Sequence, residues 1–181
     1  MQLDPELARL VSALSPAPPG DVAVLQEAGR ELNIEWPRDY LALMIERDGG
    51  YGQLGEGHVS LMQAKELLPT NRALQHEPEP PGLAPNSPDW LKRSLEEWRW
   101  AAPPPPEQLR SGLIFFGSGG GGELLAFDRD TGAVLLVPAI GSDEDSILLG
   151  STLVEALGHI ERGDTFDDPV YPRATNQRET T

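Results

Sequence analysis

The chain has 181 residues, of which 39% are hydrophobic, and its 29 acidic and 14 basic residues give a formal net charge of −15. This length suits one domain with additional segments, and no apolar run approaches the roughly 18 residues that a membrane span requires. The strong negative charge disfavours nucleic acid as a direct partner, because the two polyanions repel each other. Cysteine is absent, which excludes disulfides, thiol catalysis and cysteine-ligated zinc and is typical of a cytoplasmic protein.

The N-terminal part of the chain has the periodicity of helices. Leucine and valine recur at helical spacing over residues 3–14, and this stretch lacks the basic start of a signal peptide. Asp21 is placed to cap a second helix that extends to about Leu32. A third helix is expected to begin at Pro37 and to end at the glycines of "DGG". The stretch "HVSLMQAKELL" then predicts a short strand followed by a helix.

Residues 77–110 interrupt this pattern. Nine of the 18 prolines lie between Pro78 and Pro106, which favours loop and polyproline II conformations because proline lacks an amide donor. Between these prolines, "DWLKRSLEEWRW" predicts one short helix near Asp89–Trp98. This helix either packs onto the domain as an insertion or protrudes and binds a partner, since tryptophan is enriched at binding hot spots.

From Leu113 onward the periodicity changes to that of β-strands. Three strand-like runs, "LIFF", "ELLAFD" and "AVLLVPAI", alternate with the turns "GSGGGG" and "DRDTG", which is typical of an antiparallel meander. The stretch "ILLGSTLVEALGHIERG" predicts a short strand and a helix capped by Ser151 or Thr152 that ends at Gly163. We therefore expect one α+β domain over residues 1–163, with N-terminal helices and a closing C-terminal helix packed around a central, mostly antiparallel sheet, and then a polar tail over residues 164–181.

The glycine-rich turn also matches two nucleotide-binding patterns. Gly117, Gly119 and Gly122 satisfy the dinucleotide fingerprint, and the first and last of them satisfy half of a P-loop. Both motifs need a long helix directly after the glycines, because its N-terminus binds the phosphate. Glu123 and Leu124 stand where a P-loop has lysine and then serine or threonine. We therefore expect a turn between antiparallel strands, with Glu123 beginning the second strand and no bound cofactor.

Patterns of catalysis and metal binding are missing. His58, His76 and His159 lie far apart in the sequence and lack the spacing of zinc ligands. Ser118 follows Gly117, but Phe116 stands where the nucleophile elbow requires its first glycine. The turn "DRDTG" lacks the glycine and the glutamate that a calcium loop places at its sixth and twelfth positions. The sequence therefore predicts a protein that is not an enzyme and holds no metal.

The ordered set of segments resembles the SUKH superfamily, which includes fungal cell-wall-assembly regulators and immunity proteins of bacterial polymorphic toxin systems. Three stretches carry the resemblance: "RELNIEWPRDYLALMIERDGG", "LIFFGSGGGGELLAFDRDTGAV" and "STLVEALGHI". The resemblance runs from about Asp21 to Gly163, interrupted by residues 77–110, and Trp36 replaces the leucine that usually precedes the proline. It implies an α+β fold without a shared catalytic site.

The resemblance implies binding rather than turnover, by a cytoplasmic immunity protein that neutralises a cognate toxin. An acidic inhibitor suits a basic toxin such as a nuclease. The alternatives are a SUKH-type regulator or scaffold without a toxin, and a small-molecule sensor that uses the glycine turn. Residues 111–170 hold 11 acids and two bases, a net charge of −9, so the acidic loops are the first docking candidates. The expected partner-binding residues are Asp143, Glu144, Asp145, Asp164, Asp167 and Asp168, together with Trp90 and Trp98.

Overall fold

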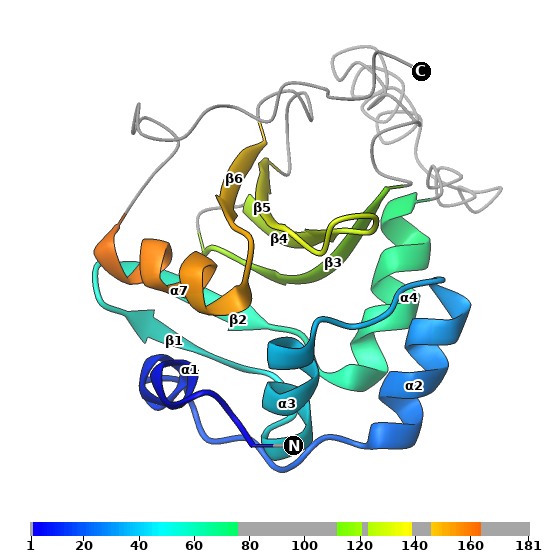
Figure 1. Cartoon of the computed structure of the whole chain (residues 1–181), viewed down its shortest axis with the longest axis horizontal. Helices are drawn as coiled ribbons and strands as arrows, with labels where there is room; N and C mark the ends of the chain where they lie inside the picture. Colours follow the sequence, from blue (N-terminus) through cyan, green and yellow to red (C-terminus); the bar gives the residue numbers. More distant parts are fainter. Residues whose placement is uncertain (1, 76–111, 121–122, 139–145, 164–181) are drawn as a thin grey trace, which may run out of the picture.

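The computed structural model describes residues 2–75, 112–120, 123–138 and 146–163 (Figure 1). The helices in this part of the chain are α1 (Pro5–Val11), α2 (Val22–Glu31), α3 (Arg38–Glu46), α4 (Ala64–Gln75) and α7 (Leu153–Arg162). The strands are β1 (Gly50–Leu54), β2 (Gly57–Leu61), β3 (Leu113–Ser118), β4 (Glu123–Asp128), β5 (Val134–Pro138) and β6 (Ile147–Gly150). The expected α+β class with a central antiparallel sheet is confirmed. The helix predicted near Asp89–Trp98 and the tail over residues 164–181 lie outside the described residues.

The six strands form one sheet in the order β1-β2-β3-β4-β5-β6, and every neighbouring pair is antiparallel. The meander predicted for β3, β4 and β5 is therefore confirmed. Strand β1 was not predicted, because two of the five residues in "GYGQL" are glycines, which weaken the strand signal. A bulge between Phe115 and Gly117 puts Phe116 and Gly117 on the same face of the sheet.

The helix caps predicted at Asp21, Thr152 and Gly163 are confirmed, and Asp4 also caps α1. The carboxylate of Asp4 accepts from the amides of Glu6 and Leu7, at 2.8 and 3.2 Å. The carboxylate of Asp21 accepts from the amide of Ala23 at 2.9 Å. Helix α7 begins after Thr152, whose hydroxyl accepts from the amide of Glu155, and ends at Gly163 in the left-handed conformation with φ +74°.

Two helices differ in extent from their sequence-based predictions. Helix α1 ends at Val11 rather than Leu14, although Leu3 and Leu14 on either side of it are both buried. Helix α3 begins one residue after Pro37 and ends at Glu46, and Arg47 takes an extended conformation in place of the expected glycine cap. Its end depends on contacts with distant residues, because the Arg47 guanidinium donates to the carbonyls of Val11 and Ser15.

Aromatic side chains fill the core between the helices and the face of the sheet that they cover, which we call the first face. The rings of Phe116 and Phe127 stack with centroids 4.1 Å apart, and Tyr40 of α3 meets both of them edge-on. Trp36 packs against Tyr40 and donates its indole N–H to the carbonyl of Leu25 at 2.8 Å. This cluster joins α2 and α3 to the centre of the sheet.

Strand β2 pairs with β3 over a short length, and the side chain of Asn71 bonds the next part of β3. The two strands pair only at Ser60 with Ser118 and at Leu61 with Gly117. Beyond that point, the fully buried Asn71 of α4 donates to the carbonyl of Phe115 at 2.7 Å and accepts from its amide at 2.8 Å. The side-chain amide of Asn71 also donates to the carbonyl of Leu67 at 2.8 Å. The side chain thus satisfies backbone groups of β3 that would otherwise be buried without a partner.

Replacing Asn71 by leucine should lower the free energy of unfolding by about 2–4 kcal/mol, because the amide and carbonyl of Phe115 would stay buried without partners. Chemical denaturation of the purified protein measures this loss. The control is Lys65→Ala at an exposed position of the same helix, which should change stability by less than about 0.5 kcal/mol. Equal losses in the two variants would contradict the assigned role of Asn71.

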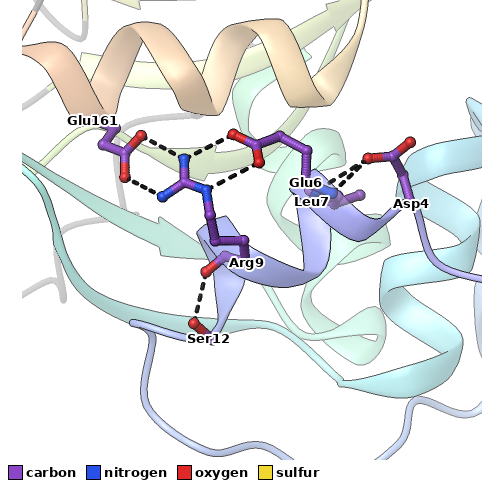
Figure 2. A network of polar contacts seen from close by, with 6 residues as sticks. All are labelled: Asp4, Glu6, Leu7, Arg9, Ser12 and Glu161. Carbon is purple, nitrogen blue, oxygen red and sulfur yellow. Dashed lines mark hydrogen bonds and ion pairs between the residues drawn. The ribbon is translucent and has the colours of Figure 1, made fainter.

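Arg9 connects α1 to α7 at the surface of the protein. Its guanidinium donates to both carboxylate oxygens of Glu161 at 2.7 Å, and also to the carboxylate of Glu6 at 2.8 and 3.0 Å (Figure 2). The hydrogen bonds from Arg9 lower the pKa of both glutamates below the ordinary value of 4.5. The backbone of Glu161 also accepts from the amide of Glu56 at 3.0 Å, so the same segment holds the β1–β2 hairpin.

The Arg9 pairs should stabilise the protein at neutral pH and lose this effect in acid. Since the folded-state pKa values of Glu6 and Glu161 are lowered, their contribution is present above 4.5 and disappears as the pH falls through the lowered values. Denaturation curves of the parent and of Arg9→Met should therefore differ at pH 7 and converge in strong acid. Arg38→Met, at another exposed arginine, is the control that should show no such convergence.

Candidate functional site

The two faces of the sheet differ in what covers them. The first face packs against the helices and contributes to the main core. Directly paired residues of antiparallel strands share a face, so the strand register assigns every other side chain to a second face. Its apolar half, on β3, β4 and β5, comprises Leu113, Phe115, Ala126, Leu135 and Val137. Its open half, on β1, β2 and the end of β3, comprises Tyr51, Gln53, His58, Ser60 and Ser118.

Tyr51 is the most prominent side chain of the open half, with 64% of its surface exposed. It lies opposite Ser60, and Gln53 lies opposite His58 in the next pair of the same hairpin. The backbone of Tyr51 is fixed by Ser15, which donates its amide to the tyrosine carbonyl at 2.8 Å and accepts from the tyrosine amide through its hydroxyl at 3.1 Å. The open half therefore presents an aromatic ring on a fixed backbone, a combination that suits contact with a protein.

The glycine turn between β3 and β4 is packed against its neighbours. Gly120 has φ +89°, and a Cβ atom there would lie 2.8 Å from the Cβ of His58. A Cβ at Gly119 would lie 3.1 Å from a methyl group of Leu136. Strand β4 begins at Glu123, as predicted, so a strand stands where a phosphate-binding helix would be needed. Gly119 thus serves close packing, and Gly120 serves both close packing and a positive φ.

Gly120→Ala should destabilise the protein by about 1–2 kcal/mol, because alanine is strained at positive φ and would press on His58. The matched control is Gly158→Ala in α7, where the new Cβ would have ordinary van der Waals distance to its nearest neighbour, the end of Arg162. That control should gain about 0.5–1 kcal/mol from helix propensity. Thermal unfolding of the two variants measures both effects. A neutral result at Gly120 would contradict the packing described for the turn.

Tyr40 is a buried ionisable group with a structural role. Its side chain is fully buried, and its hydroxyl has no hydrogen-bond partner within the described part of the chain. Burial raises the pKa of Tyr40, and the carboxylate of Asp48 raises it further. The phenol therefore stays protonated at neutral pH, and its ring serves to pack Phe116 and Phe127.

The described side chains do not assemble a metal centre. Among these residues, no group of three or more histidine, aspartate or glutamate side chains is close enough to hold a metal ion. His58 lies on the open half, whereas Nδ1 of His159 on α7 lies 2.8 Å from the guanidinium of Arg162. His76 lies outside the described residues.

A shallow hollow of about 270 Å³ lies against α1 and α3. Its lining includes Leu3, Val11, Pro16 and Arg47. Two charged groups, the carboxylate of Glu46 and the guanidinium of Arg47, line the hollow. The guanidinium is already engaged, since it donates to the carbonyl of Gly49 at 3.2 Å in addition to those of Val11 and Ser15. Burial lowers the pKa of Arg47. The hollow therefore offers little to recognise an anionic ligand.

The structure leaves the predicted partner-binding residues untested and adds a surface that was not predicted. The open half depends on the pairing of β1 with β2, and β1 was missed. The alternation of polar His58 and Ser60 with buried Val59 and Leu61 was the available signal for a surface on β2. Eight predicted residues lie outside the described ranges: Asp143, Glu144, Asp145, Asp164, Asp167, Asp168, Trp90 and Trp98.

Comparison of the chain with models of known protein families and with curated proteins found no match. None of the helices in the described ranges is both long and apolar enough to cross a membrane. The function is therefore inferred from the resemblance of the ordered sequence segments and from the chemistry of the surfaces.

Proposed function

We propose that the protein is a non-catalytic binding module, a cytoplasmic immunity protein that neutralises a cognate bacterial toxin by direct contact. The order of the segments carries the proposal. The stretches that resemble the SUKH superfamily form, in chain order, the end of α2 with α3, the β3–β4–β5 meander, and α7. This succession agrees with the helices, antiparallel sheet and closing helix that the resemblance implies.

The charge and the exposed aromatic ring support contact with a basic protein. A net charge of −15 attracts a basic partner over long range and accelerates encounter. Tyr51 offers a large contact area at low entropic cost, because its backbone is already held by Ser15. A nuclease toxin, whose own site must be basic to bind phosphate, is the class of partner that best fits the net charge of this protein.

The alternatives differ in their support. A regulator or scaffold without a toxin partner would use the same surfaces and is separated from the proposal by experiment. A small-molecule sensor would need space at the glycine turn, and there Gly119 and Gly120 pack against Leu136 and His58. We therefore do not retain the sensor as a second candidate.

The test is to produce the protein together with the product of the neighbouring gene. The proposal expects a stable complex after size-exclusion chromatography, and survival of cells that express the neighbouring gene only when this protein is present. A second immunity-type protein from an unrelated locus is the control for specificity. If cells are not protected and no complex forms with the neighbouring product, the immunity function is wrong, and a complex without any toxicity would favour a scaffold.

Two sets of substitutions should affect toxin binding in different ways. Reversing Asp143, Glu144 and Asp145 to lysine should slow association and weaken its salt dependence, because long-range attraction would be reduced. Tyr51→Ala should mainly accelerate dissociation, at a cost of about 2 kcal/mol if the ring is a hot spot. Surface plasmon resonance at two salt concentrations measures both rates. If the triple reversal associates as fast as the parent at low salt, the acidic loop is not the docking surface.

A further inference from the structure

The apolar half of the second face is buried more completely than the described helices account for. Phe115 and Ala126 are fully buried, and Val137 is 1% exposed. Helix α4 alone among the described helices contributes a side chain to this cluster, through Leu74. Figure 1 shows α4 beside β3, whereas β5 lies two strands further along the sheet. A further covering element is therefore required over β4 and β5.

We propose that residues 76–111 of the same chain dock on this apolar half and supply the cover, with residues 89–100 lying across β4 and β5. This segment starts and ends beside the apolar half. It follows Gln75, one residue after Leu74, which packs on the apolar half. It ends one residue before Gly112, which leads directly into Leu113, a member of the same cluster. Both ends thus lie at the border of the surface to be covered.

Residues 89–100 have the apolar pattern of an amphipathic helix. Trp90, Leu91, Leu95 and Trp98 occupy one side of a helix, and Lys92 and Glu96 occupy the other. Large apolar side chains along one side match a sheet face lined by leucine, valine and phenylalanine. The tail over residues 164–181 offers only Phe166, Val170 and Tyr171 as large apolar residues, among many polar ones. The tail therefore suits this face less well.

Residues 76–111 are also long enough to cross the apolar half. A helix of twelve residues is about 18 Å long, and the four strands from β3 to β6 span about 14 Å at a spacing of about 4.8 Å. The connections on either side of residues 89–100 have more than ten residues each, and an extended chain covers about 3.3 Å per residue. The segment can therefore cross the whole apolar half without strain in its connections.

Docking would have a functional consequence that does not depend on the identity of any partner. The side chains of Trp90 and Trp98 would be buried against the sheet and would not be available to a second protein. Partner binding would then fall to the open half and to the acidic loops.

The absence of cysteine makes disulfide trapping a clean test in the full-length protein. Ser94 lies on the apolar side of the predicted helix, so Ser94→Cys is combined with Ala126→Cys or with Leu148→Cys on the second face. Gln53→Cys on the distant strand β1 is the matched control partner. Under mild oxidation, at least one of the two test pairs should form an intramolecular disulfide about tenfold faster than the control pair, because docking raises the local concentration.

The disulfide experiment can contradict the proposal in three ways. Equal rates in test and control pairs, or no disulfide in either test pair, would overturn the proposal. Disulfides that form only between chains would also overturn it, and would make a second copy of the protein the cover.

A second measurement avoids any change in the sheet itself. Ser94→Glu places a carboxylate in the apolar side of the segment, and Lys92→Glu places one on the opposite side as the control. Docking predicts that only Ser94→Glu shifts tryptophan emission to longer wavelengths and raises acrylamide quenching about twofold, because buried indole rings would become exposed. The same emission and quenching in both variants would overturn the proposal.

Discussion

Two hydrogen bonds between the side chain of Asn71 and the backbone of Phe115 fix α4 to the first strand after residue 112. Strand β2 pairs with β3 at only two positions before the chain turns into α4, so the backbone pairing between the N-terminal part and the strands after residue 112 is short. The side chain of Asn71 continues the role of a strand and bonds both backbone groups of Phe115. This fixes β3, and with it the position of Phe116 beneath Tyr40.

Close packing on the first face leaves the open half of the second face as the surface that is available for recognition. A Cβ atom at Gly57 would lie 2.4 Å from the carbonyl of Ile160, and one at Gly52 would lie 3.1 Å from the carbonyl of Ala13. These glycines let α7 and the segment after α1 approach the hairpin closely. Because substitutions there would push the helices away, the side chains on the open half of the second face are freer to serve recognition.

Sequence patterns predicted the features that depend on neighbours in the chain. The caps at Asp21 and Thr152 follow from a side chain and the amides two or three residues later, and the meander follows from alternating runs and turns. Strand β1 and the end of α3 could not be predicted, since they depend on Ser15 and on the carbonyls that bind Arg47. The acidic and tryptophan-bearing candidates for partner binding stay predictions.

Ser15 gives the sheet a property that concerns the protein at high concentration. The outer edge of β1 would be a template for pairing with another copy of the chain, as exposed strand edges are in self-assembling proteins. The amide and hydroxyl of Ser15 bond both backbone groups of Tyr51, so that edge is already occupied by the protein's own chain. Polymerisation through β1 would have to displace Ser15 from Tyr51 first, which opposes the pairing of a second copy along that edge.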